Sequence, residues 1–399
     1  MQNVERTMVN QLRRHGFDMD VIEQTPTPFY CYDMNLLNRT IGRILQETAG
    51  APYVVHYAIK ANSNPHILST IAHSGLGADV VSGGEIRVAL NNGFKAENIN
   101  FSGVAKTDWE IQLGLECGIG CFNVESSDEL QVINDIAGKM GKTAPVAFRV
   151  NPDIDAHTHR FITTGTAANK FGIAMDELDS VIDLSQRMNH VKLLGHHFHI
   201  GSQITQMQPF VMLFDTINHM VERYNRLGIH FEHINVGGGL GIDYSSPDEH
   251  PFAPFRDYFD TFKKGLAPLH GMPIHFELGR AIVASCGTLI SRVVYIKENK
   301  GKKFALIDAG MNDLIRPALY GAHHVIQNLT SNERACETYE VAGPVCESSD
   351  VFATDCQLPL TRRGDILAIR SAGAYGESMA SCYNMRPLPA CVCCPAPEN

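Results

Sequence analysis

The sequence lacks the features that mark nucleic-acid-binding and membrane proteins. Charges of both signs are scattered, no Lys/Arg-rich tract occurs, and the formal net charge of the 399 residues is −10, so we expect no nucleic-acid partner. No apolar run approaches the roughly 18 residues that cross a bilayer. Residues 1–16 lack the apolar stretch of a signal peptide. We therefore predict a cytoplasmic protein without a membrane partner.

Compact cysteine spacing, short-period repeats and low-complexity linkers are also missing. The 11 cysteines are spread along the chain, which in a reducing compartment predicts mostly free thiols. Cys391, Cys393 and Cys394 lie close together, but no further pair at zinc-finger spacing accompanies them. We interpret this cluster as an exposed tail, with metal binding as the alternative, and we predict no metal centre.

The sequence does contain a regular alternation of apolar runs and segments with helical periodicity. Continuous apolar strands separated by helices indicate a parallel sheet covered on both faces. Eight such units over about 230 residues are typical of a (β/α)8 barrel. The predicted strands are Tyr53–Ile59, Ala78–Val81, Ile99–Val104, Cys121–Val124, Pro145–Val150, Leu193–Ile200, Ile234–Val236 and Ile274–Leu278.

The pattern changes after Gly279, where turn residues instead of long helices separate the β-like runs. This predicts a second, mostly antiparallel β domain. Residues 27–33 are also strand-like and could pair with that domain. We therefore predict an α/β protein with a TIM-like (β/α)8 barrel at 34–280 and a β domain formed by 1–33 plus 281–399. The runs that define the second domain are Arg292–Ile296, Phe304–Ile307, Tyr339–Val341 and Ile366–Ile369.

The first predicted barrel strand runs directly into Lys60. Catalytic groups of such barrels lie where strands end, at the C-terminal face, and desolvation there would lower the pKa of a lysine. An amine that loses its proton readily suits Schiff-base chemistry. The alternative is a lysine whose ammonium group reaches solvent at the barrel mouth, and the strand by itself leaves both interpretations open.

The ends of the sixth and seventh strands carry histidines and glycines. Alternation puts His197 and His199 on one face of the strand and His196 on the other, which suits a zinc ligand as well as a core or ring-stacking histidine. The glycines 237–239 would let backbone N–H groups approach an anion, although a turn without a ligand is equally compatible. They do not form a dinucleotide fingerprint, because Ile242 stands where a glycine would be needed.

The eighth strand ends with Glu277, followed by Arg280. A carboxylate within an apolar run needs a partner, and a protonated pyridine nitrogen would serve. Arg280 can hold a carboxylate or a phosphate through two hydrogen bonds. A salt bridge between the two residues is the alternative, but their positions along the chain make them poor partners.

Taken together, these motifs resemble the fold-type III pyridoxal-phosphate (PLP) decarboxylases, and they are most similar to the members that act on diaminopimelate. The resemblance covers residues from about 27 to 390. The motifs that carry it are His56–Asn62, Val81–Glu85, Asn151–His159, Lys170–Ile173, His199–Gln203, Gly237–Gly239, Glu277–Arg280, Gly343–Ala353 and Ser371–Gly376.

The resemblance implies a role for each candidate residue around the cofactor. Lys60 would hold PLP as a Schiff base, His199 would stack on its ring, and Glu277 would keep the ring nitrogen protonated. Tyr375 would contact both cofactor and substrate. The residues implied around the phosphate are Ser202, Gly238, Gly239, Gly279 and Arg280.

The resemblance also implies how the amino-acid substrate is held. Arg280, Arg316 and Tyr320 would bind its distal carboxylate. In a homodimer with shared active sites, Cys346 and Glu347 would come from the partner subunit. Glu347 would bind the distal amino group, and either Cys346 or Lys60 would supply a proton to the substrate carbon.

The implied reaction is PLP-dependent decarboxylation of meso-2,6-diaminopimelate to L-lysine and CO2, the last step of lysine biosynthesis. Decarboxylation of ornithine, arginine or a carboxypolyamine is an alternative, but those substrates lack the second carboxylate for Arg316. Alanine racemases pair the ring nitrogen with arginine, which Glu277 contradicts. A non-catalytic PLP-binding protein would need neither Cys346 nor Glu347. The chain departs from the family pattern at Leu278, where proline is usual, and at Glu377, where an apolar residue is common.

Overall fold

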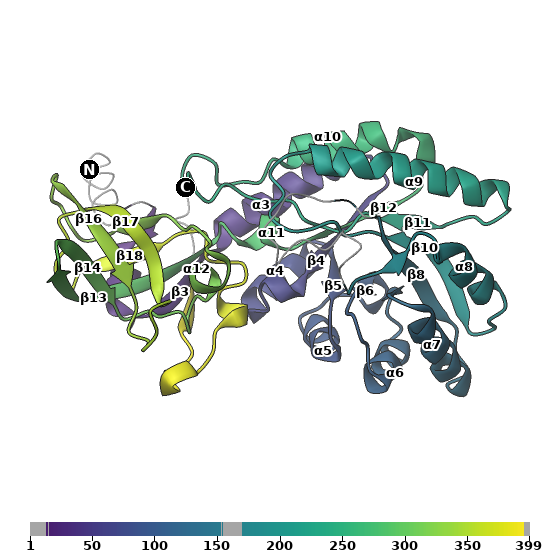
Figure 1. The fold of residues 1–399 in the computed structure, drawn as a ribbon, viewed down its shortest axis with the longest axis horizontal. Coiled ribbons are helices and arrows are strands. Elements are labelled where there is room, and N and C mark those ends of the chain that lie inside the picture. Colours follow the sequence, from purple (N-terminus) through teal and green to yellow (C-terminus); the bar gives the residue numbers. More distant parts are fainter. Residues whose placement is uncertain (1–12, 15, 153, 155–169, 395–399) are drawn as a thin grey trace, which may run out of the picture. The chain divides into compact units, whose positions relative to one another are not determined.

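The computed structural model describes residues 13–14, 16–152, 154 and 170–394, so most of the motif Asn151–His159 lies outside the described residues. The chain divides into two compact units (Figure 1). The barrel unit comprises 39–242 and 252–282, and the β unit comprises 1–38, 243–251 and 283–399. The segment 243–251, which falls within the predicted barrel range, groups with the β unit.

Eight parallel strands close into a ring in the barrel unit. They follow the order β4-β5-β6-β7-β8-β10-β11-β12, and β12 pairs again with β4. This confirms the predicted (β/α)8 barrel, with strand ends shifted by a few residues. The strands are β4 (Tyr53–Ala58), β5 (Gly77–Val80), β6 (Ile99–Phe101), β7 (Cys121–Val124), β8 (Ala144–Asn151), β10 (Val191–His197), β11 (His233–Asn235) and β12 (Ile274–Leu278); the short β9 (Ile173–Ala174) extends β8.

Amphipathic helices cover the outside of the ring (Figure 1). In α7, Ser126 caps the first turn by accepting from the Glu129 N–H, and Leu130, Ile133 and Ile136 form the buried stripe. The helices along the barrel sequence are α3 (Met34–Thr48), α4 (Pro65–His73), α5 (Gly83–Asn91), α6 (Asp108–Cys117), α7 (Ser127–Lys139), α8 (Leu178–Gln186), α9 (Gln208–Arg226), α10 (Phe255–Gly265) and the short α11 (Arg280–Val283).

Strand alternation separates an apolar outer face from a polar interior. The Phe276 ring packs against Phe259 and Phe262 of α10, with ring centroids 5.1 Å apart in both pairs. Glu277, the next residue, therefore points into the barrel. The strand register puts His56 on the same interior face as Glu277. Other buried polar side chains in these strands are Asp79, Asn100, Asn123, Arg149, His197, His233 and Asn235.

The β unit is a mostly antiparallel sheet in the order β15-β18-β13-β14-β16-β17. Residues 29–33 form β3, which pairs antiparallel with β13, so the predicted pairing of the N-terminal strand with this sheet is confirmed. The strands are β3 (Phe29–Asp33), β13 (Gly287–Asn299), β14 (Lys302–Ile307), β15 (Ile326–Asn328), β16 (Cys336–Ala342), β17 (Val351–Pro359), β18 (Ile366–Ile369) and β19 (Ala390–Cys394), with β1 (Arg13–Arg14), β2 (Phe17–Asp18), α2 (Met19–Gln24) and α12 (Arg316–Tyr320) beside them.

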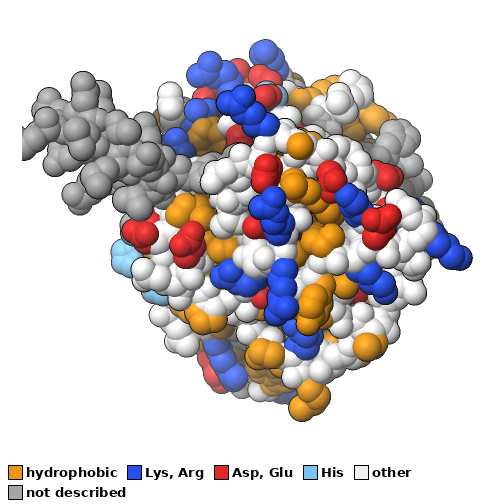
Figure 2. Space-filling model, turned by 90° about the vertical axis from the view of Figure 1, so that its left-hand side faces the viewer, with side chains coloured by type: hydrophobic (Ala, Val, Ile, Leu, Met, Phe, Trp, Pro, Cys, Tyr) orange, Lys and Arg blue, Asp and Glu red, His pale blue; other side chains and the backbone are white. Residues whose placement is uncertain are grey.

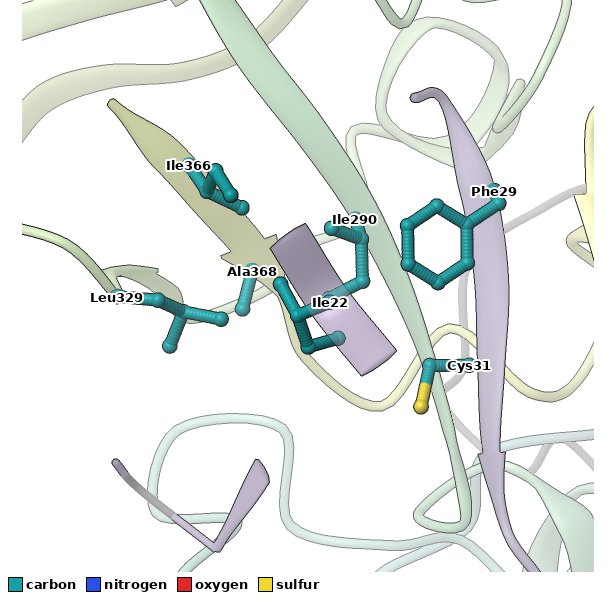
Figure 3. Close-up of a cluster of buried hydrophobic side chains, with 7 residues drawn as sticks. All are labelled: Ile22, Phe29, Cys31, Ile290, Leu329, Ile366 and Ala368. Atoms are coloured by element: carbon teal, nitrogen blue, oxygen red, sulfur yellow. The ribbon is translucent and has the colours of Figure 1, made fainter. Parts of the chain in front are cut away.

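A small apolar core joins the N-terminal segment to this sheet. Figure 3 shows Ile22 of α2 and Phe29 of β3 together with Ile290 of β13, and all three side chains are fully buried. Each element contributes one or two apolar side chains, so the cluster needs segments from both ends of the chain. The complete cluster is Ile22, Phe29, Cys31, Ile290, Leu329, Ile366 and Ala368.

The prediction of an exposed cysteine tail is wrong. Residues 390–394 form β19, which pairs in parallel with β3, and Cys394 forms a disulfide with Cys31. Val392 and Cys394 pack against the apolar core of the β unit. β3 lies near the other end of the chain, and the two bonded cysteines are 363 residues apart. Local sequence therefore contains no sign of this strand.

The surface mixes charges of both signs. Figure 2 shows basic and acidic side chains interspersed with separate apolar ones on one face of the molecule. In the β unit, the charged side chains pair across neighbouring strands, as Lys302 does with Glu340 and Lys303 with Glu337. Of the helices that the structure describes, none is both long and apolar enough to span a membrane.

Candidate active site

A cavity of about 350 Å³ is present in the barrel unit. Lys60 follows β4, His197 ends β10, and Glu277 lies near the end of β12. The C-terminal ends of parallel strands meet at one face of such a barrel, which explains why residues so far apart in the chain line one cavity. The lining residues are Lys60, Val81, Ser102, Gly103, Val104, Arg149, Phe171, His197, His199 and Glu277.

Lys60 lies in the 3-10 turn Ile59–Ala61 directly after β4. Ile59 and Ala61 are fully buried, but Lys60 is exposed. Of the two interpretations that the sequence left open, the structure therefore supports the solvent-accessible lysine, whose side chain lines the cavity. This position leaves the amine accessible to a molecule in the cavity.

The His199 ring is fixed by the glycine segment after β11. The backbone N–H of Gly238 donates to Nδ1 of His199 over 3.2 Å. Burial, and next the charge of Lys60, lower the pKa of His199 well below its usual value. A neutral ring with Nδ1 as acceptor carries its proton on Nε2, so His199 presents an uncharged aromatic surface to the cavity.

Glu277 has protein partners on both carboxylate oxygens. Oε1 accepts from Nδ2 of Asn235 at 2.7 Å and, more weakly, from Nδ2 of Asn123 and Oγ of Ser102, both at 3.3 Å. Oε2 lies 3.0 Å from Nε2 of His197. Burial raises the pKa of Glu277, but the charge and hydrogen bond of His197 outweigh it and hold the pKa well below its ordinary value. Glu277 is therefore an ionised carboxylate.

Asp79 on β5 is a second buried carboxyl group near Glu277. Its Oδ1 accepts from the Ser102 hydroxyl at 2.5 Å, and Oδ2 has no hydrogen-bond partner among the described residues. Burial, and next the charge of Glu277, raise the pKa of Asp79 well above its usual value. The pKa values of the two neighbouring carboxyl groups are thus shifted in opposite directions, upward for Asp79 and downward for Glu277.

The predicted anion-binding residues of the barrel unit come together in part. Nη2 of Arg280 donates to Oγ of Ser202 over 3.0 Å, so these two side chains are neighbours. A Cβ atom at Gly238 would lie 1.9 Å from the carbonyl oxygen of Glu277, so glycine is required there whether or not an anion binds. Because the Gly238 N–H is already used by His199, the backbone N–H groups of Gly239 and Gly279 are the better candidates for an anion.

Arg149 of β8, which lines the cavity, forms a buried ion pair that was not predicted from the sequence. Nη1 of Arg149 donates to Oε1 of Glu125 at 2.8 Å, and the guanidinium carbon lies 4.5 Å from the centre of the Phe171 ring. Oε2 of Glu125 also accepts from the Gly172 N–H at 2.7 Å. Asn123 and Asn235 were missed for the same reason, because each lies within a strand whose apolar pattern hides its interior-facing polar residue. His197 was singled out in the sequence, but its contact with Glu277 was not predicted.

The β unit holds the residues predicted to bind the distal end of the substrate. Nη1 of buried Arg316 lies 2.8 Å from Nε2 of His324, and its guanidinium carbon lies 4.7 Å from the centre of the Tyr244 ring. Tyr320 is on the same short helix, α12, one turn after Arg316. Sequence reasoning missed Tyr244 and His324, because neither follows a regular strand or a recognised motif.

The remaining candidates of the β unit lie in loops. Tyr375 has a φ of 55°, a left-handed conformation that is uncommon for tyrosine and concentrated at functional sites. Cys346 and Glu347 are exposed, and Oε1 of Glu347 accepts from the Tyr383 hydroxyl at 2.5 Å. Oε2 of Glu377 accepts from the Tyr32 hydroxyl at 2.5 Å, which gives a polar partner to the residue that departs from the family pattern.

Comparison with known proteins places the chain in a family. The sequence model for the pyridoxal-binding domain of pyridoxal-dependent decarboxylases matches residues 35–284. A diaminopimelate decarboxylase from Bacteroides thetaiotaomicron is 55% identical over 374 residues, which are 94% of this chain and 97% of the relative. A diaminopimelate decarboxylase from Pseudomonas aeruginosa is 42% identical over 369 residues, which are 92% of this chain and 87% of the relative.

Solved structures agree with the sequence comparison. Diaminopimelate decarboxylase from M. jannaschii in complex with L-lysine has a TM-score of 0.89 at 38% identity, and the match covers 95% of this chain and 90% of that one. The Helicobacter pylori enzyme complexed with L-lysine has a TM-score of 0.88 at 40% identity, covering 93% and 92% of the two chains. The chain belongs to the pyridoxal-dependent decarboxylases and, within them, to the diaminopimelate decarboxylases.

Proposed function

We propose that the protein converts meso-2,6-diaminopimelate to L-lysine and CO2 with pyridoxal phosphate as cofactor. The observation that carries the proposal is the meeting of an accessible amine, a neutral imidazole and an ionised carboxylate in one cavity, from Lys60, His199 and Glu277. The high identity to diaminopimelate decarboxylases supports the choice of substrate. L-lysine, which two solved relatives contain, is the product expected here.

The residues of the barrel unit fit this cofactor chemically. Lys60 offers the primary amine that pyridoxal phosphate needs for covalent attachment. Glu277 offers a fixed negative charge that favours a protonated ring nitrogen, and His199 offers an uncharged ring for stacking. Arg280 and Ser202 offer donors to the phosphate, together with the backbone N–H groups of Gly239 and Gly279, whereas the Gly238 N–H holds His199. When bound, the cofactor supplies the electron sink for breaking the bond between Cα and the carboxylate.

The residues of the β unit are proposed to select the substrate. Arg316 and Tyr320, with Arg280 of the barrel unit, would bind the distal carboxylate, and Tyr375 would contact both cofactor and substrate. Diaminopimelate carries that second carboxylate, whereas ornithine and arginine do not. The lysine/ornithine decarboxylase of Vibrio vulnificus has a TM-score of 0.82 but is only 21% identical, so that likeness supports the fold alone.

The direct test is the release of CO2 from a panel of amino acids by the protein supplied with pyridoxal phosphate. We expect release from meso-diaminopimelate and formation of L-lysine, with at least 100-fold lower kcat/KM on ornithine, arginine and lysine, roughly the loss caused by an unpaired buried charge. Preferential release from ornithine or arginine would contradict the proposed substrate. Cofactor binding without any CO2 release would support the non-catalytic alternative.

We further propose a homodimer in which Cys346 and Glu347 complete the partner's active site. Their exposure in the single chain is compatible with such a role, and Cys346 is a candidate proton donor alongside Lys60. Lys60→Ala and Cys346→Ala dimers should each be nearly inactive. After subunit exchange about half of the dimers are mixed, each with one intact site, so about a quarter of wild-type activity should return. No recovery despite demonstrated exchange would place Cys346 in its own chain's site.

The cytoplasmic location also remains a proposal. Nine described cysteines are free thiols, which is usual for proteins of a reducing compartment. Fractionation of the source cells, with decarboxylase activity as the marker, would test it.

A further inference from the structure

The two oxygens of the Glu277 carboxylate have different kinds of partner. Oε1 accepts hydrogen bonds from two amides and one hydroxyl, all of which are neutral. Oε2 faces the imidazole of His197, with Nε2 3.0 Å away and side-chain exposures of only 1% for His197 and 5% for Glu277. His197 is therefore the hydrogen-bonding partner of Glu277 that can carry a positive charge.

The position of His197 is set by the barrel itself. It is the last residue of β10, and the register pairs it with Asn235 on β11 and with Arg149 on β8. Its Nδ1 is buried and has no hydrogen-bond partner among the described residues. Glu277 is thus the polar group that orients the imidazole and requires a proton on Nε2.

Asp79 shows what happens to a buried carboxyl group in this interior without such a partner. Its hydrogen-bond partner is the neutral hydroxyl of Ser102, and burial, together with the negative charge of Glu277, raises its pKa well above the usual value. Glu277 is buried in the same interior, yet the charge and hydrogen bond of His197 lower its pKa despite burial. Among the groups that lower the pKa of Glu277, the His197 imidazole makes the largest contribution, and it is also the one at hydrogen-bond distance from Oε2.

Other titratable groups of the barrel unit interact electrostatically with this pair. Lys60 and His199 contribute smaller favourable charges to Glu277. The remaining groups that face the pair are His56, Asp79, Cys121, Arg149, His233, Tyr258 and His275.

We propose that His197 is a positioning residue for the decarboxylation: by donating from Nε2 to Oε2, it holds Glu277 ionised and fixed in the place where it would pair with the ring nitrogen of pyridoxal phosphate. This inference rests on the proposed function, because it assigns that pairing to Glu277. His197 acts through Glu277 and does not itself touch the reacting atoms. Loss of the imidazole removes the largest favourable charge from Glu277, in an interior that favours its protonated form.

The test compares His197→Phe and His197→Gln with a matched control, His196→Phe. His196 is the preceding residue and is also fully buried, but it packs against Phe231 with ring centroids 4.5 Å apart, on the opposite face of the strand. Phenylalanine keeps the ring volume and removes the nitrogen atoms at either position. Glutamine at 197 keeps a hydrogen-bond donor but cannot carry a charge.

The first measurement is the affinity of the apoprotein for pyridoxal phosphate between pH 8 and pH 5.5. The phosphate of the cofactor titrates in this range, so the wild type sets the baseline, and we expect His196→Phe to follow the same pH profile. Relative to the wild type, the affinity of both His197 variants for pyridoxal phosphate should fall by about tenfold or more between pH 8 and pH 5.5. The reason is that each unit by which the pKa of Glu277 rises costs a factor of ten. At pH 8, His197→Phe should also lower kcat by about 10- to 100-fold with little change in KM, because the lost charge acts on the transition state.

The outcomes separate this inference from the proposed function. If the wild type neither binds pyridoxal phosphate nor releases CO2 from diaminopimelate, the proposed function fails. If the wild type does both, but His197→Phe and His197→Gln match it in affinity at every pH and in kcat, the role of His197 is refuted. Should His197→Phe fail to fold, His197→Gln decides alone: an affinity that falls more steeply with pH than that of the wild type supports the inference, and a profile parallel to the wild type overturns it.

Discussion

Nδ2 of Asn235 on β11 donates to Oε1 of Glu277 on β12 over 2.7 Å, although 42 positions separate the two residues in the chain. This contact fixes one oxygen of the carboxylate and leaves the other to His197. The hydrogen bonds to the side chain of Glu277 can therefore be largely kept when only its charge is removed. A conservative substitution can therefore separate the charge from the packing.

Glu277→Gln should fold and bind pyridoxal phosphate but lose activity by about 100-fold or more, roughly 3 kcal/mol of transition-state stabilisation. The amide can accept from Asn235, but it cannot keep the ring nitrogen protonated. Steady-state kinetics on diaminopimelate and the thermal midpoint should be measured together. Near-normal turnover in a folded variant would show that the carboxylate charge is dispensable.

Lys60 should be the attachment site of the cofactor. The protein with bound pyridoxal phosphate should be yellow, and borohydride reduction followed by peptide mapping should label Lys60, because its amine lines the cavity. Lys60→Ala should give no label. Lys106 is an internal control, since its ammonium is held by the Gly103 and Asn123 carbonyls and by Glu129; a label there would overturn the assignment.

Arg316→Ala should weaken binding of L-lysine, whose carboxylate corresponds to the distal one of the substrate, by about 2–5 kcal/mol, as for a buried charge that loses its partner. Binding of 1,5-diaminopentane, which has no carboxylate, should change little. Isothermal titration with both ligands measures the difference. The control is Arg362→Ala, an exposed residue paired with Glu333. Equal losses for the two ligands would speak against a carboxylate at Arg316.

Unfolding at mildly acidic pH should take up protons at buried histidines. Burial lowers the pKa of His196 from 6.5 to about 3 and that of His233 to about 4. Each is neutral when folded at pH 5 but mostly charged when unfolded, so stability is complete above pH 6.5 and decreases as the pH falls toward the folded pKa.

Calorimetry at pH 5 in buffers of different ionisation enthalpy measures this uptake directly. His196→Phe should take up about one proton fewer on unfolding than the wild type. His270→Asn, at an exposed position with a φ of 48° that asparagine tolerates, is the control and should change nothing. Equal uptake in wild type and His196→Phe would mean that His196 is already charged in the folded state.

The disulfide between Cys31 and Cys394 should stabilise the β unit, because it ties β19 to β3. Cys394→Ser should lower the free energy of unfolding by about 2–4 kcal/mol under oxidising conditions. Dithiothreitol should bring the wild type to the same thermal midpoint. The exposed Cys391 of the same strand serves as control through Cys391→Ser. A wild-type midpoint that is insensitive to reductant would show that the bond contributes nothing.

The sequence by itself determined the barrel, because each of its strands is an apolar run long enough to stand out between helices. The ends of these runs are also visible in the sequence, so the pattern alone places Lys60, His199 and Glu277 at the C-terminal face of the barrel. The strand Phe29–Asp33 is recognisable for the same local reason. The family motifs then supply roles that periodicity does not.

Only the tertiary structure decided what surrounds those residues. The partners of Glu277 come from four other strands or strand ends. Asn123 and Asn235 do not differ locally from residues of the core, and the sequence singled out His197 without indicating its contact with Glu277. The strand Ala390–Cys394 pairs with Phe29–Asp33 near the other end of the chain, and the local residue pattern does not predict such long-range pairing. The acidity of buried groups is likewise decided by the tertiary structure. The carboxyl groups of Asp79 and Glu277 look alike in sequence, but burial raises the pKa of Asp79, whereas an imidazole 3.0 Å away helps to lower that of Glu277.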